Sequence, residues 1–164
     1  MNKTANFNDV SASSHTRISI FWKEDYKKWE ARTSRFGFNY ICRVTDEKGE
    51  EIAYLKYNIL KSMITPVYGV FIQGRKVMDI RRKISLIENY SCSDTDYRME
   101  ADECLEKWTV FHKGKKIIEI CSVDHHNGNP DYQICTYDTY QVLSVCFCLV
   151  MNMSLKLLLY ESKH

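Results

Sequence analysis

The feature that most constrains the fold of this chain is an apolar run near its C-terminal end. Residues 142–151 read VLSVCFCLVM, in which Ser144 is the one polar residue. A helix that is apolar on every side must be enclosed on every side. Because the preceding residues read as short amphipathic strands, we expect these strands to wrap around a central helix over about residues 139–155.

The same run can also be read as a membrane span. Extended to residue 160, it approaches the length of about 20 residues that a bilayer requires. Asn152, Ser154 and Lys156 interrupt it, however, and a lysine within a span costs roughly 3 kcal/mol. A helix buried in the protein's own core avoids this cost, so we favour the buried helix.

Length and composition indicate one ordinary globular domain. The 164 residues suffice for a single sizeable core. The formal net charge of +2 lacks the concentrated basic excess of nucleic-acid-binding domains, so we expect no nucleic-acid partner. We expect residues 1–15, which are polar and contain no signal-peptide-like run, to be flexible, and residues 16–164 to form the domain, as a monomer.

The cysteines indicate a reducing compartment. There are seven of them, an odd number, and none form a C-x-x-C pair. This pattern argues against a disulfide framework. We therefore expect a cytoplasmic protein.

Three segments in the body of the chain repeat one pattern. Residues 49–56, 74–81 and 114–121 each have a glycine, two charged residues, a β-branched residue and then apolar residues in alternation. The glycine supplies the positive φ of a tight turn, so each unit is predicted to be a β-hairpin. Alternation predicts that one set of side chains shares a face and that the β-branched residues take the other. The first set is Ala53 and Leu55, Met78 and Ile80, and Ile118 and Ile120; the second is Ile52, Val77 and Ile117.

Further strands are predicted over residues 17–22, 28–34, 95–101 and 131–137. Strands at such regular spacing favour an antiparallel sandwich or barrel. A sandwich has no central axis for an all-apolar helix, whereas a closed barrel has one and also removes exposed sheet edges. We therefore predict a mainly β fold, a closed antiparallel barrel of about 10–12 strands, wide enough to surround a buried hydrophobic C-terminal α-helix.

The order of these hairpins, followed by the apolar helix, resembles the LURP-one-related proteins. The segments that carry the resemblance are YICRVTDEKG at 40–49, VYGVFIQGRKVMDIRRK at 67–83 and KWTVFHKGKKIIEI at 107–120. These proteins belong to the tubby-like C-terminal domain superfamily, together with the phospholipid scramblases. The resemblance covers roughly residues 17–155 and implies a twelve-stranded antiparallel barrel around the helix. The tubby branch binds phosphoinositide head groups through lysine and arginine, but its binding motifs have no counterpart here, and the family's first strand is not evident.

The strongest surface signal is basic and lies near two predicted turns and at the end of one strand. Lysine and arginine can hold phosphate head groups through charge-assisted hydrogen bonds. The alternative is a set of solvated turns and protected sheet edges, for which lysine is the usual device. The candidate ligand-binding residues are Arg75, Lys76, Arg81, Arg82, Lys83, Lys113, Lys115 and Lys116.

Other candidate sites are weaker. Asp124, His125 and His126 could reach one cation from a loop, but no second spaced pair completes a metal site. Cys146 and Cys148 point about 200° apart on a helix and cannot share an ion, so buried apolar packing is favoured. No Gly-rich phosphate loop, G-x-S-x-G or H-E-x-x-H motif occurs. We therefore predict no metal, no cofactor and no catalytic residue.

A barrel filled by its own helix has no internal cavity, so any site must lie on its outside or at a rim. This argues against an enzyme, which usually needs a concave pocket. We expect a non-enzymatic cytoplasmic module, peripheral at the membrane, that binds anionic phospholipid head groups through the basic turns. Three alternatives remain open: a protein-interaction or structural module with an exposed aromatic patch at Trp22 and Trp29, scramblase-like lipid transport, and an enzyme built on loop 124–131.

Overall fold

The computed structural model describes residues 1–11, 16–58, 60, 65–83, 89–93, 95–123 and 131–161. Twelve antiparallel strands close into a barrel, and a single long helix follows them. The strands are β1 (Lys3–Asp9), β2 (Arg17–Trp22), β3 (Lys27–Phe36), β4 (Asn39–Thr45), β5 (Glu51–Asn58), β6 (Val67–Ile72), β7 (Arg75–Lys83), β8 (Asn89–Cys92), β9 (Tyr97–Ala101), β10 (Lys107–His112), β11 (Lys115–Val123) and β12 (Asp131–Thr136). A short 3₁₀ helix, η1 (Asp138–Tyr140), leads into α1 (Gln141–Glu161).

The sheet is a simple meander that returns to its start. Each strand pairs with the next along the chain, and β1 pairs with both β2 and β12 to close the ring. Closure places Lys3 opposite Thr136 and Asn8 opposite Asp131. The predicted closed antiparallel barrel is thus confirmed, and successive strands run in opposite directions between its two ends.

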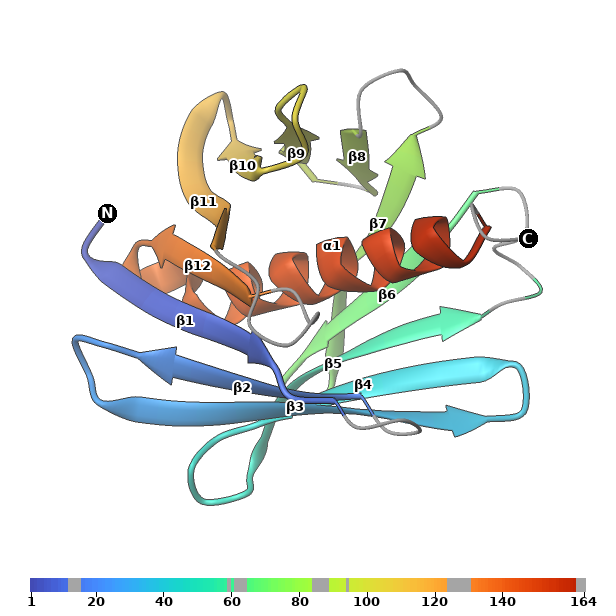
Figure 1. Ribbon diagram of the computed structural model, residues 1–164, viewed down its shortest axis with the longest axis horizontal. Helices are drawn as coiled ribbons and strands as arrows, with labels where there is room; N and C mark the ends of the chain where they lie inside the picture. Colours follow the sequence, from blue (N-terminus) through green and yellow to red (C-terminus); the bar gives the residue numbers. More distant parts are fainter. Residues whose placement is uncertain are drawn as a thin grey trace.

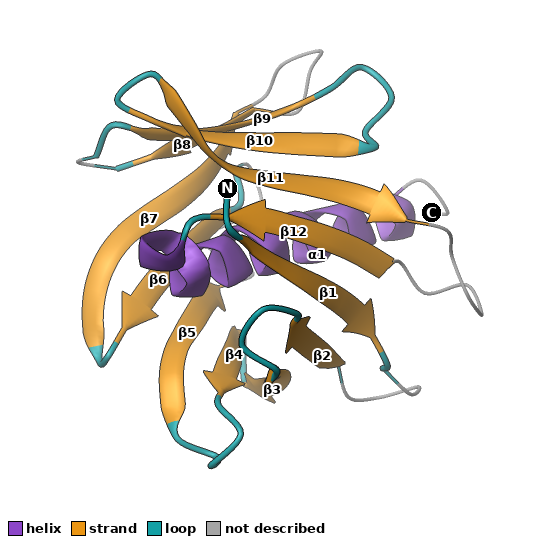
Figure 2. Ribbon diagram, turned by 90° about the vertical axis from the view of Figure 1, so that its left-hand side faces the viewer, coloured by secondary structure: helices purple, strands orange, loops and turns teal. Residues whose placement is uncertain are grey.

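The helix α1 fills the barrel. Figures 1 and 2 show α1 running through the ring of strands, with β1–β4 on one side and β8–β11 on the other. Residues 145–152 are fully buried, as an all-apolar helix requires. The helix ends later than the predicted residue 155, and its first predicted turn is the 3₁₀ helix η1. In the part of the chain that the structure describes, no helix has the length and apolarity that a membrane crossing requires.

The repeated hairpins share a β-bulge that the alternation did not predict. All six residues predicted to share one face are buried, as expected for the inner face of the barrel. The strand register shifts beside each turn, however, at the positions of Ile52, Val77 and Ile117. A bulged residue is released from the regular pleat. Val77 accordingly is exposed and Ile52 half-buried, but Ile117 is buried, against the prediction.

Two strands were not predicted. Residues 1–15 were expected to be flexible, yet β1 occupies Lys3–Asp9 and closes the barrel. Its outward residues are polar, and only Ala5, Phe7 and Asp9 are buried, so its pattern is hard to distinguish from a polar tail. The four-residue strand β8 lies in the polar segment 88–96 and is too short to show alternation.

The aromatic patch proposed for protein interaction does not exist at Trp22 and Trp29. Both side chains lie on the inner face, 0% and 7% exposed, and their rings meet edge to face at 5.4 Å between centroids. Each alternates with outward neighbours on its strand, which directs both indoles into the core. Trp22 and Trp29 therefore stabilise the barrel and offer no aromatic patch to a partner.

Candidate functional site

The predicted basic residues divide between the two ends of the barrel. The β6–β7 and β10–β11 turns lie at the end where α1 begins, because β12 also ends there. Strand β7 then runs away from its turn, so Arg81 and Lys83 lie near the opposite end. Eight residue steps along β7 separate Arg75 from Lys83, a distance of about 26 Å. The eight candidates therefore do not form one patch.

Several of these residues already have local partners. Lys76 Nζ lies 2.9 Å from a carboxylate oxygen of Asp79. Lys116 Nζ lies 2.8 Å from Glu119, which also pairs with Lys107 at 3.0 Å. Arg82 is half-buried on β7. These contacts are those expected of solvated hairpins, which was the alternative interpretation of the basic turns.

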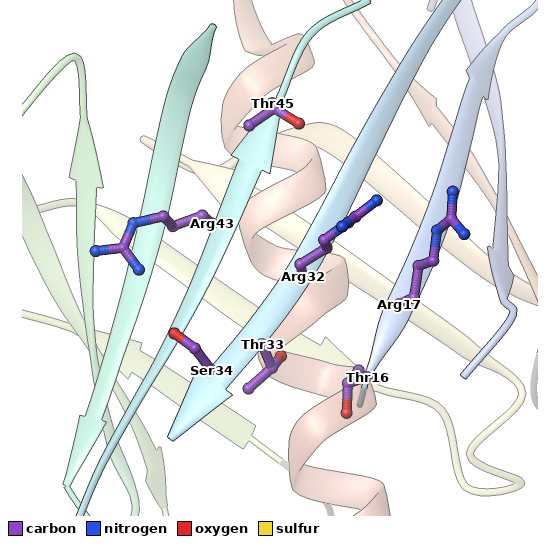
Figure 3. Close-up of a pocket in the computed structure, with 7 residues that line it drawn as sticks. All are labelled: Thr16, Arg17, Arg32, Thr33, Ser34, Arg43 and Thr45. Atoms are coloured by element: carbon purple, nitrogen blue, oxygen red, sulfur yellow. The ribbon is translucent and has the colours of Figure 1, made fainter. Parts of the chain in front are cut away.

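A different basic cluster, not predicted from the sequence, lies on the outer face of β2, β3 and β4. Arg17 on β2 is directly opposite Arg32 on β3, and Arg32 is directly opposite Arg43 on β4. We call these three residues the arginine row. Figure 3 shows them on neighbouring strands, with the side chains of Arg17 and Arg32 extended in the same direction and that of Arg43 extended away from them, towards β5. Their side chains are 53%, 69% and 50% exposed. Like charges directly opposite one another in a sheet are destabilising, so the row is not explained by the stability of the barrel.

Two carboxylates partly neutralise the row. Glu30 accepts a hydrogen bond from Arg32 Nε and another from Arg17 Nη2 at 2.9 Å. Glu51 pairs with Arg43 Nε at 3.0 Å. The hydrogen bonds from Arg32 and Arg17 lower the pKa of Glu30, so this carboxylate is charged at neutral pH. Three guanidinium groups against two carboxylates leave a local charge of +1.

Among the described residues, the ion pairs of the arginine row leave most of its hydrogen-bond donors without a partner. Each ion pair engages one nitrogen of a guanidinium, and each guanidinium carries five N–H donors in a planar fork. Such forks match the paired oxygens of phosphate and carboxylate groups. The row therefore has the chemistry to bind an oxyanion without giving up its internal ion pairs.

The row lines a shallow depression of about 570 Å³ on the barrel surface. Residues with hydroxyl side chains complete its lining, although the hydroxyl oxygen of Thr33 is itself buried; the lining comprises Thr16, Arg17, Arg32, Thr33, Ser34, Arg43 and Thr45 (Figure 3). A second depression of about 560 Å³ shares Arg32 and Thr45 but also contains Glu30, Asp46 and Glu47. Its carboxylates would repel an anion, so of these two depressions the first suits an anion better.

The other predicted sites can be placed only in part. Among the described residues, no three His, Cys, Asp or Glu side chains are grouped so that they could hold a metal ion. The candidates Asp124, His125 and His126, and the loop 124–130, lie outside the described residues. Cys146 and Cys148 are buried inside the barrel, and burial raises the pKa of Cys146 to about 12. This thiol is thus protonated and enclosed, and it packs as an apolar side chain.

Comparison of the chain with protein-family models, with curated proteins and with solved structures finds no match.

The sequence indicates the arginine row only in part. The strands predicted over residues 17–22 and 28–34 pair in the structure as a hairpin, and their register places Arg17 opposite Arg32. Arg43 joins them only through the register of the next hairpin. Because the three residues are spread over 27 positions, no local cluster of charge indicates them.

Proposed function

We propose that this protein is a non-enzymatic binding module that contacts anionic phospholipid head groups through the arginine row. The observation that carries the proposal is the alignment of Arg17, Arg32 and Arg43 across three strands, in a depression with unused guanidinium donors. This site replaces the basic hairpin turns, which lie partly at opposite ends of the barrel and are partly paired with carboxylates.

The filled interior supports a surface-binding role. Small-molecule sites in barrels generally occupy the lumen or its mouth. Here residues 145–152 of α1 take up that space. The depression at the arginine row is shallow and outward-facing, which suits a ligand presented on a surface better than one enclosed for chemistry.

The resemblance to the LURP-one-related proteins agrees with this proposal. The resemblance implies a twelve-stranded barrel around a helix, and twelve strands surround α1. The tubby branch of that superfamily binds phosphoinositide head groups. We include membership of the tubby-like superfamily in the proposal.

The test is co-sedimentation with phosphatidylcholine vesicles that contain or lack phosphatidylserine or phosphoinositides. We expect the protein to bind the anionic vesicles and to be released as salt increases. Each basic residue near an anionic surface contributes about 1 kcal/mol, so Arg32→Glu should weaken binding by about tenfold or more.

The matched control is Arg98→Glu. Arg98 is a similarly exposed arginine on β9, paired with Glu100 at 3.0 Å, on the other side of the barrel from the arginine row. The two variants change the net charge equally, so their binding to anionic vesicles should differ only if the arginine row is the binding site. If both variants lose the same amount of vesicle binding, the effect is one of net charge and not of the arginine row. If the unaltered protein binds neutral vesicles as well as anionic ones, the proposal is wrong.

A further inference from the structure

The tip of the β3–β4 hairpin exposes two aromatic side chains. Phe36 is 83% exposed and Phe38 is 55% exposed. Gly37 lies between them with φ of +61°, which turns the chain tightly and presents both rings at the tip. A single exposed apolar side chain is ordinary, but two phenylalanines at one hairpin tip form a patch that a contact with another surface would bury.

Other exposed apolar side chains lie at the same end of the barrel. β1, β3 and β5 all run toward this end, so the residues after them are neighbours along one rim. Val10 follows β1 and is 51% exposed, and Leu60 follows β5 and is 55% exposed. We call Val10, Phe36, Phe38 and Leu60 the apolar rim.

Basic side chains stand directly behind the apolar rim. Arg35 Nε donates to the carbonyl oxygen of Gly37 at 3.0 Å, and its guanidinium lies 5.6 Å from the ring centroid of Tyr40. Arg32 lies four residues before Phe36 on the same strand, about 13 Å away. Arg17 begins β2 at this end of the barrel.

This order of chemistry, an apolar tip followed by arginine, matches the depth profile of an anionic membrane. Aromatic rings favour the boundary between head groups and acyl chains, and guanidinium groups favour the phosphate layer above it. The arginines behind the apolar rim would repel the same arginines of a second copy of this chain. Charge complementarity therefore favours an anionic bilayer as the partner.

We propose that Phe36 and Phe38 insert into the interface of an anionic membrane and orient the barrel with this end toward the bilayer. The inference rests on the proposed function, because the arginine row supplies the electrostatic attraction. It adds the orientation and an apolar anchor that a charge-only contact lacks. The two contributions differ in salt dependence, since ion pairing is screened and apolar burial is not.

The experiment uses the full chain and vesicles of phosphatidylcholine with phosphatidylserine. The variant Phe36→Ser/Phe38→Ser alters exposed side chains and should fold normally. We expect it to bind at least tenfold more weakly, as the loss of two buried phenylalanines predicts, at both low and high salt. The matched control, Tyr26→Ser, removes an aromatic ring that is 84% exposed in the β2–β3 turn at the opposite end, and it should bind like the unaltered protein.

A second readout is the fluorescence of Phe38→Trp, which should shift to the blue and be quenched by brominated lipid when anionic vesicles are added. If the protein binds and Arg32→Glu weakens binding, but Phe36→Ser/Phe38→Ser does not, the insertion is wrong and the proposed function stands. If the unaltered protein does not bind anionic vesicles, both the insertion and the proposed function are wrong. Loss of self-association in the tip variant, with vesicle binding intact, would make the tip an interface between copies and overturn the insertion.

Discussion

Leu105 occupies a backbone conformation that ordinarily favours glycine. Its φ is +55°, and it lies in the turn between β9 and β10. In this turn the carbonyl oxygen of Asp102 accepts from Leu105 N at 3.2 Å, and Asp102 Oδ1 accepts from Glu106 N at 2.9 Å. The turn after β4 is built alike around Asp46, but there Gly49 takes the equivalent position. The β9–β10 turn thus carries the cost of a left-handed non-glycine residue, which the turn after β4 avoids.

We predict that Leu105→Gly raises the free energy of unfolding by about 0.5–1 kcal/mol. The left-handed conformation costs a non-glycine residue about 1–2 kcal/mol, and the greater flexibility of glycine in the unfolded chain offsets part of this gain. Urea denaturation measures the change. The reverse substitution, Gly49→Leu, should lower stability by a similar amount, and a destabilised Leu105→Gly would contradict the assignment.

At the scale of elements, polar contacts fasten α1 inside the barrel at both ends. Near its start, Gln141 Nε2 donates to Asp25 Oδ2 at 3.0 Å. Near its end, the Ser154 hydroxyl lies 3.0 Å from the hydroxyl of Tyr68, and Lys156 forms an ion pair with Asp9 of β1. The lysine that argued against a membrane span is therefore part of the attachment of the helix to β1.

The Asp9 carboxylate is buried, yet it stays charged. Burial alone would raise its pKa, but hydrogen bonds from Lys156 and Ser11 outweigh burial and hold the pKa below its ordinary value of 3.8. A carboxyl group whose pKa is lower in the folded protein than in the unfolded chain stabilises the fold at pH values above its unfolded-state pKa. This contribution is lost as the pH falls through the folded-state pKa. The attachment of α1 to β1 should therefore weaken in acid.

We predict that Lys156→Met lowers the free energy of unfolding at pH 7 by about 2 kcal/mol, because it leaves the Asp9 charge buried without its partner. The loss is smaller than for a fully buried pair because Lys156 is partly exposed. The buried charge disappears when the carboxyl is protonated, and the pKa of Asp9 lies below its ordinary value of 3.8. The difference from the unaltered protein should therefore shrink in acid, at about pH 3. Denaturation at the two pH values measures this, with Lys156→Arg as the charge-preserving control. An equal loss at both pH values would show that packing, and not charge, is responsible.

The elements differ in how far their residues predict them. The alternation of large apolar side chains along the strand located β2 to the residue, since Ile18, Ile20 and Trp22 all face inward. Strand β1 carries too few apolar residues to be found, although it closes the barrel and holds Asp9. The arginine row depends on the pairing of three strands, and pairing is set by turns and bulges as well as by composition.

At the scale of the whole molecule, one end of the barrel combines the features on which the proposed function depends. The apolar rim lies at the end toward which β1, β3 and β5 run, and the arginine row lies behind it on the outer face of β2–β4 (Figures 1 and 3). In the proposed function the interior takes no part, because residues 145–152 of α1 are buried within it. A barrel so filled is a rigid support for a surface site, since each strand of the row is held by a neighbour on both sides.

The burial of α1 inside the barrel excludes an interior site and leaves the surface for binding, and thiol labelling with mass mapping tests this burial directly. Cys146 and Cys148 are fully buried on α1, whereas Cys104 is exposed in the β9–β10 turn. A thiol reagent added to the native protein, with or without anionic vesicles, should modify Cys104 and leave Cys146 and Cys148 unmodified until denaturant unfolds the barrel. Labelling of Cys146 or Cys148 in the native protein at a rate like that of Cys104 would contradict the account.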